Sequence, residues 1–108
     1  MGIDSDSEAL SLLTPLVSVT NENFALITDA IIRRSEIQFE YVGADLSKQV
    51  RRIAPYSMRG QAGSWYLVGL DREKDSLRTF RLDRIVSEVT IDKKGNTFEI
   101  PDQLPHLN

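Results

Sequence analysis

The chain has 108 residues, which is room for one domain with one hydrophobic core but not for two. Hydrophobic residues make up 41% and charged residues 27%, an ordinary globular composition. There is no cysteine, which excludes disulfides and thiolate metal sites, and a single histidine, His106, argues against Ser–His–Asp catalysis and multi-histidine metal centres. No apolar run approaches the ~18 residues of a membrane helix and the acidic N-terminus is unlike a signal peptide, so we expect a cytoplasmic protein with no membrane partner.

The net charge of −3 conceals a segregation of charge along the chain. Residues 48–84 contain nine basic and four acidic side chains, a balance of +5, whereas the rest of the chain has a balance of −8. Seven of those nine basic residues are arginine, whose planar fork of donors suits phosphate and carboxylate. A basic patch for a polyanion is therefore one interpretation, and a solvated surface with internal ion pairs is the other.

The N-terminal part predicts two helices, a short one over Glu8–Leu13 and a longer one over Glu22–Arg34. In the longer helix Phe24, Ile27 and Ile31 follow the spacing of a single apolar stripe. This helix is expected to cover one end of the following sheet.

After Ser35 the pattern changes to the alternation of a half-buried β-strand. Five strands are predicted, over Ile37–Tyr41, Lys48–Met58, Trp65–Leu70, Leu77–Leu82 and Ile85–Ile91. Pro55 requires an edge, a bend or a bulge in the second strand, and Gly69 indicates strong bending or a close backbone approach in the third. A short edge segment, Thr97–Ile100, is expected to follow.

The expected fold class is α+β, mainly β: a small five-stranded barrel preceded by an N-terminal helix. Closure would remove the exposed edges that five short strands otherwise present. We expect a linker and short helix over residues 1–20, one domain over 21–100 and a C-terminal tail over 101–108.

Three blocks in this order carry a family resemblance: Arg52–Tyr56, then Gly63–Asp71 with its Trp65-Tyr66-Leu67 tripeptide, then Arg78–Ile85. Together they resemble the WYL domain, which is named for that tripeptide and occurs in bacterial transcriptional regulators. The resemblance covers roughly residues 21–100.

The resemblance implies an Sm-like, SH3-type barrel that acts as the ligand-sensing module of a transcriptional regulator. It further implies a DNA-binding domain elsewhere in the parent chain and a basic groove for single-stranded nucleic acid or a nucleotide-like ligand. Because no recognition-helix pattern is present, the chain is expected to be a fragment of a longer regulator. No cofactor or metal is implied.

Three arginines of the third block are candidate ligand-binding residues. Arg81 lies between Phe80 and Leu82, so alternation turns it away from the core, and the resemblance places its equivalent in the ligand groove. Arg84 follows at the strand end, with an ion pair to Asp83 or Glu88 as its alternative. Arg78 shares parity with Phe80 and is expected at the rim of the core.

The remaining candidates are Arg52, Tyr56 and Trp65. Arg52 and Tyr56 share a face if no bulge intervenes, and with Arg81 they would join a phosphate clamp to a stacking ring. For Tyr56 a core position is an equal alternative, and for Trp65 a structural role against core or helix is favoured.

Two further functions compete with ligand sensing. A protein-interaction or dimerisation module is the alternative, with the Thr97–Ile100 edge and the N-terminal helix as candidate surfaces for a homo-oligomer. An enzyme is the least supported, since no acid/base pair and no phosphate-binding glycine loop is recognisable.

Overall fold

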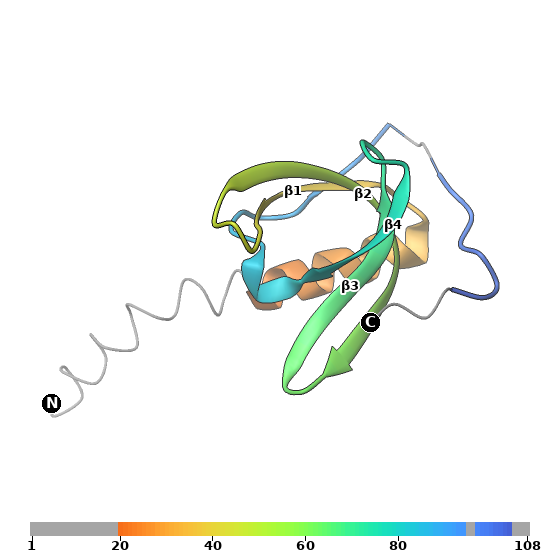
Figure 1. Ribbon diagram of the computed structural model, residues 1–108. Coiled ribbons are helices and arrows are strands. Elements are labelled where there is room, and N and C mark those ends of the chain that lie inside the picture. Colours follow the sequence, from red (N-terminus) through yellow and green to blue (C-terminus); the bar gives the residue numbers. More distant parts are fainter. Residues whose placement is uncertain (1–19, 95–96, 105–108) are drawn as a thin grey trace, which may run out of the picture.

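The computed structural model describes residues 20–94 and 97–104, and consists of a helix followed by a curved antiparallel sheet (Figure 1). The helix occupies residues 20–33 and buries Ile27 and Ala30 completely, with Phe24 and Ile31 packed beside them. The predicted apolar stripe is therefore confirmed. The predicted helix Glu8–Leu13 lies outside the described residues.

The helix ends on a left-handed residue, Arg34, whose φ is 58°. The Ser35 N–H donates to Ala30 O (2.9 Å) and the Arg34 N–H to Ile31 O (3.2 Å), which is the hydrogen-bond pair of a Schellman motif. This motif turns the chain sharply from the helix into the first strand.

Five strands form one sheet in the order β4-β3-β2-β1-β5, and all the neighbouring strands are antiparallel. Their bounds are β1 Ile37–Val42, β2 Lys48–Gln61, β3 Ser64–Asp71, β4 Ser76–Arg81 and β5 Thr90–Ile91. The first four confirm the predicted strands to within a few residues. The β2–β3 hairpin is longer than expected because its turn contains only Ala62 and Gly63, both with positive φ (52° and 81°).

One face of the sheet packs against the helix to form the core, to which each strand contributes alternate residues. Phe39, Phe80 and Tyr41 pack edge to face there, with ring centroids 5.1–6.1 Å apart. Alternation therefore leaves the second, outer face of the sheet to carry the polar side chains.

A β-bulge interrupts β2 at Tyr56, since Pro55 pairs with Gly69 and Ser57 pairs with the adjacent Val68. The predicted irregularity at Pro55 is confirmed. A Cβ on Gly69 would lie 2.6 Å from Ala54 O and 2.6 Å from Ile53 Cγ2, so the two backbones approach too closely for a side chain. The expected close approach at Gly69 is confirmed as well.

The prediction for the fifth strand is wrong over most of its length. Leu82–Arg84 form a 3₁₀ turn, Ile85 makes one isolated bridge to Tyr41, and only Thr90–Ile91 extend the sheet. Buried Asn23 of the helix supplies the reason, because its side chain donates to Ser87 O (2.9 Å) and accepts from the Val89 N–H (2.8 Å). These side-chain hydrogen bonds occupy backbone groups that a strand would pair.

The sheet is not closed into a barrel, so the barrel prediction is not confirmed. β4 pairs only with β3 and β5 only with β1 in the part of the chain that the structure describes. The Arg81 N–H donates to the Tyr41 hydroxyl (3.0 Å) across the gap between β4 and β1. Thr97 makes one isolated bridge to Ser35, in place of the predicted edge strand Thr97–Ile100.

No helix within the described ranges, 20–94 and 97–104, is long and apolar enough to cross a membrane.

Candidate ligand-binding site

Three polar side chains form a row across β2, β3 and β4 on the outer face. Tyr66 pairs in register with Arg59 on one side and with Arg81 on the other. Side chains directly opposite one another in an antiparallel pair lie on the same face, with Cβ atoms about 4.5–5.5 Å apart. The register therefore places a tyrosine between two arginines.

This row opens into a pocket of about 430 Å³ beside Arg84, which we call the Tyr66 pocket. It is lined by Tyr41, Arg59, Gln61, Ala62, Tyr66, Val68, Thr79, Arg81 and Arg84. Three arginines thus line one concave surface, whose positive field can attract an anion.

The charges of the Tyr66 pocket are only partly neutralised. Arg81 Nε lies 2.7 Å from Asp83 Oδ1, and both side chains are about half exposed. Arg59 and Arg84 have no ion pair with any described residue. The alternative expected for Arg84, a pair with Asp83, is instead made by Arg81. Two cations are therefore left available to a ligand.

Tyr41 connects the Tyr66 pocket to the core. Its ring packs on Phe80 (5.1 Å between centroids), while its hydroxyl accepts the hydrogen bond from the Arg81 N–H. Because the ring is fixed by the core, the hydroxyl holds the end of β4, and with it Arg81, in place.

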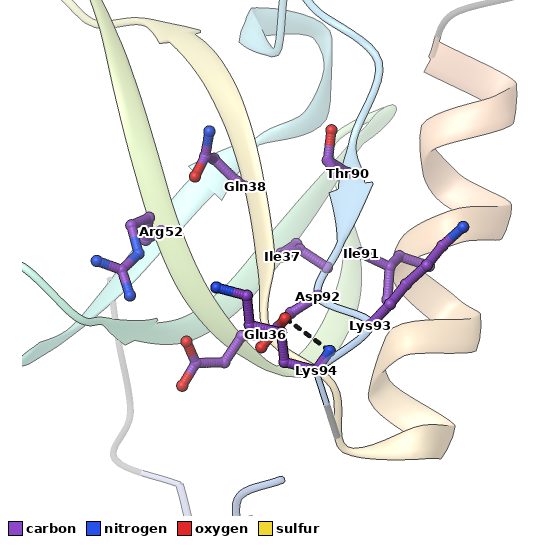
Figure 2. A pocket seen from close by; sticks show the side chains of 9 residues that line it. All are labelled: Glu36, Ile37, Gln38, Arg52, Thr90, Ile91, Asp92, Lys93 and Lys94. Atoms are coloured by element: carbon purple, nitrogen blue, oxygen red, sulfur yellow. Dashed lines mark hydrogen bonds between the residues drawn. The ribbon is translucent and has the colours of Figure 1, made fainter. Parts of the chain in front are cut away.

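Of the six predicted site residues, the structure brings only Arg81 and Arg84 into this pocket. Arg52 lies exposed on β2, where it pairs in register with Gln38 of β1. It lines a separate pocket of about 680 Å³, the Arg52 pocket (Figure 2). The nine lining residues are Glu36, Ile37, Gln38, Arg52, Thr90, Ile91, Asp92, Lys93 and Lys94.

Tyr56 lines neither pocket, and the grouping of Arg52, Tyr56 and Arg81 is not assembled. The bulge at Tyr56 disrupts the parity on which that grouping depended. The half-buried ring contacts Phe98 instead, at 5.8 Å between centroids.

Trp65 packs on the helix. Its ring meets Phe24 edge to face at 4.9 Å, although the residue remains 48% exposed. Trp65, Phe24 and Leu82 border a small cavity of about 190 Å³. These contacts agree with the structural role that was favoured for Trp65.

Arg78 lies at the rim of the core, as its parity predicts, with its guanidinium 5.9 Å from the Phe80 ring centroid. Its Nη1 is also 3.9 Å from Oδ2 of Asp71, which is fully buried. Arg51 approaches the same oxygen to 3.5 Å, and its side chain is only 13% exposed. Arg51 and Arg78 thus compensate a buried carboxylate.

Sequence reasoning missed Arg59 and Tyr66 as site residues. Arg59 lies beyond Met58, the predicted end of the second strand, and Tyr66 was noted only as part of the family tripeptide, yet the two residues pair in register on β2 and β3. A two-residue Ala62-Gly63 turn, read as the hairpin centre, would have put the two side chains opposite one another.

No cluster of three or more His, Cys, Asp or Glu side chains suited to a metal ion occurs among the residues with described positions.

The helix and the five-stranded sheet define a small α+β domain that carries a cationic pocket on the outer face of its sheet. The WYL domain matches residues 22–91, and the chain belongs to this family.

Two relatives are proteins named PafB. The PafB of Mycobacterium leprae is 33% identical over 84 residues, 76% of this chain and 25% of that protein. The PafB of Mycobacterium tuberculosis H37Rv is 49% identical over 41 residues, 38% of this chain and 12% of that protein. The chain thus spans about a quarter or less of the length of these relatives.

Among solved structures, proteasome accessory factor B/C (PafBC) of Arthrobacter aurescens is similar with a TM-score of 0.73 and 28% identity. The similarity covers 78% of this chain and 13% of that one. It therefore extends the match from the sequence to the fold.

Proposed function

We propose that this WYL domain is the ligand-sensing module of a bacterial transcriptional regulator, and that its Tyr66 pocket binds single-stranded nucleic acid or a nucleotide-like ligand. The observation that carries the proposal is the row in which Tyr66 lies between Arg59 and Arg81. An aromatic ring flanked by guanidinium groups combines a stacking surface for a base with donors for phosphate.

The residues have distinct roles in this proposal. Arg59 and Arg84, which have no ion pair with the described residues, bind phosphate oxygens, and the Tyr66 ring stacks on a base. Arg81, held by Tyr41 and Asp83, borders the pocket and adds to its positive field. Arg52, Tyr56, Trp65 and Arg78 lie outside this pocket and take no part in it.

The test is fluorescence anisotropy of labelled single-stranded DNA and RNA, titrated with the domain at low and moderate salt. Arg59→Ala combined with Arg84→Ala should weaken binding at least about tenfold, because each removes a charge-assisted hydrogen bond of about 1.5–3 kcal/mol. The slope of log K against log salt should also become shallower, by about 0.7 for each lost phosphate contact.

Lys74→Gln is the matched control for charge, because Lys74 is exposed in the turn after β3 and lines neither described pocket. It should leave affinity and salt slope nearly unchanged. Salt-independent binding, or equal effects of the double variant and of Lys74→Gln, would contradict a phosphate site in the Tyr66 pocket.

The relatives support a longer parent protein. Because the chain covers 25% of the Mycobacterium leprae PafB, we propose that the domain acts together with a DNA-binding domain in its parent chain. Ligand binding at the Tyr66 pocket would then bias how that second domain engages DNA.

Self-association is a second candidate function, favoured by exposed apolar side chains. Ile32 of the helix is 72% exposed, and Val50 and Val86 are 48% and 44% exposed. Glu40 pairs with Val50 in register and accepts a backbone hydrogen bond from Val86, so these two valines flank it. Light scattering over a wide concentration range tests the idea, and a constant monomer mass would contradict it.

A further inference from the structure

Most cations that lack a partner are gathered in two places. Six Lys and Arg side chains make neither an ion pair nor a hydrogen bond with another described residue: Arg52, Arg59, Lys74, Arg84, Lys93 and Lys94. Arg59 and Arg84 line the Tyr66 pocket, and Arg52, Lys93 and Lys94 line the Arg52 pocket. Among these six cations, only Lys74 lies in neither pocket. The Arg52 pocket therefore holds at least as many cations without a described partner as the Tyr66 pocket does.

The floor of the Arg52 pocket is a polar row across three strands. Gln38 of β1 pairs in register with Arg52 of β2 on one side and with Thr90 of β5 on the other, so the three side chains share a face. All three are exposed. A guanidinium, an amide and a hydroxyl group are thus presented together to one ligand.

The carboxylates of this pocket are already engaged. Glu36 Oε2 is 2.7 Å from Arg72 Nη2, and Asp92 Oδ1 accepts a hydrogen bond from the Lys94 N–H (3.0 Å; Figure 2). Glu36 is thus offset by a cation, whereas the backbone N–H that binds Asp92 carries no charge. Asp92 therefore offsets only one of the two charges of Arg52 and Lys94, and the remaining positive charge favours an anion.

Lys93 and Lys94 extend in different directions. Figure 2 shows the Lys94 side chain passing over the strands on the side of Arg52, whereas Lys93 extends the other way, toward the helix. The cationic part of the pocket is therefore formed by Arg52 and Lys94, and Lys93 provides a neighbouring charge that points elsewhere.

We propose that the Arg52 pocket is a second binding site, for the phosphate of a nucleotide-sized ligand. Arg52 and Lys94 bind the phosphate, and Gln38 and Thr90 hydrogen-bond the sugar or base. A volume of about 680 Å³ is ample for one nucleotide unit. The phosphate comes either from a nucleic-acid strand that also occupies the Tyr66 pocket or from a free nucleotide.

The sheet register makes the first source feasible. Ala54 pairs with Leu70 and Arg59 pairs with Tyr66, so Arg52 and Ala54 share the outer face with Tyr66 and Arg59. One nucleic-acid strand can therefore contact both pockets without passing around an edge of the sheet. A nucleic-acid strand as the source depends on the proposed function of the Tyr66 pocket. Phosphate binding by the Arg52 pocket does not depend on it.

The experiment compares Arg52→Gln combined with Lys94→Gln against the control Lys74→Gln, which removes a charge that lies in neither pocket. The probes are adenosine 5′-monophosphate, followed by amide chemical shifts in NMR, and oligothymidylates of increasing length from a trinucleotide upward, followed by anisotropy. The double variant should weaken at least one probe class by about tenfold. Lys74→Gln should change the affinity for both probes by less than about twofold.

The pattern of loss identifies the source. If a nucleic-acid strand supplies the phosphate, Arg52→Gln with Lys94→Gln weakens the binding of long but not short oligomers. Arg59→Ala with Arg84→Ala then weakens the binding of oligomers of every length. If a free nucleotide supplies it, the monophosphate shifts amides near Gln38, Arg52 and Thr90, and the double variant abolishes those shifts. This second result holds even if no oligomer binds and the proposed function fails.

The second site would be overturned if Arg52→Gln with Lys94→Gln left the affinity for both probes unchanged, or if Lys74→Gln weakened them equally.

Discussion

Gly69 of β3 pairs with Pro55 of β2, next to the bulge at Tyr56. A methyl group there would meet backbone and side-chain atoms at 2.6 Å, a distance that real Cβ contacts essentially never show. Since one of these atoms, Ala54 O, belongs to the backbone, the strand itself would have to move. The absence of a side chain at Gly69 is thus a packing requirement of the sheet.

Gly69→Ala should lower the free energy of unfolding by about 1–3 kcal/mol or more, because it overpacks a closed contact. Urea denaturation measures this change. Gly43→Ala is the control, since its Cβ would meet Asp45 Oδ1 at an ordinary 3.5 Å. Equal stability of both variants would contradict the close approach.

Asp45 organises the turn between β1 and β2. Its Oδ1 accepts hydrogen bonds from the Ser47 hydroxyl (2.8 Å) and the Ser47 N–H (3.1 Å), which lower the pKa of its carboxyl below the ordinary 3.8. A lowered folded-state pKa means that the contribution to stability is present above the unfolded pKa and is lost as pH falls through the folded pKa.

NMR titration of the Asp45 carboxyl should therefore give a pKa below 3.8, and Ser47→Ala should raise it, because the hydroxyl donor is the largest cause of the shift. Ser64→Ala, in the β2–β3 hairpin, should leave it unchanged. An Asp45 pKa that does not respond to Ser47→Ala would show that the hydroxyl does not hold the carboxylate.

At the scale of elements, the β2–β3 hairpin positions the candidate site. Its two-residue turn fixes the register, and the register fixes Arg59 opposite Tyr66. Gly63 allows this turn because its φ is 81°, a conformation that side chains rarely adopt.

Gly63→Ala should cost about 1–2 kcal/mol of stability, as expected for a left-handed residue that gains a Cβ. No atom lies within 4 Å of that Cβ, so the cost comes from the backbone alone. Thermal unfolding followed by circular dichroism measures it. A melting temperature equal to that of the unchanged protein would indicate that the turn adapts freely.

At the scale of the whole molecule, the helix is what completes the core of an open sheet. Ile27 and Ala30 are fully buried against the strands, and Asn23 holds the segment that crosses from β4 to β5. A sheet of this size without the helix would expose its apolar face to water.

Ile27→Ala should therefore cost about 2–5 kcal/mol, which is a large share of the 5–15 kcal/mol typical of a domain. Urea denaturation followed by the fluorescence of Trp65, which packs on the same helix, measures it. Ile32→Ala is the matched control, because Ile32 lies on that helix but is 72% exposed. Similar losses of unfolding free energy in Ile27→Ala and Ile32→Ala would contradict a core that packs against one face of the helix.

The sequence determined by itself the helix, the first four strands, the irregularity at Pro55 and the family. These features depend on local periodicity, on residues with restricted backbones and on a sequence motif, and all three can be recognised from neighbouring residues in the sequence. The outward position of Arg81 also followed from alternation.

Only the tertiary structure decided the fifth strand, the open sheet and the composition of the site. Asn23 captures backbone groups more than 60 residues away, a contact that no local pattern records. The bulge removed Tyr56 from the predicted grouping, and strand register supplied Tyr66 and Arg59 in its place. Register and partner choice depend on long-range packing, which is why a site built across three strands emerges only when those strands are paired.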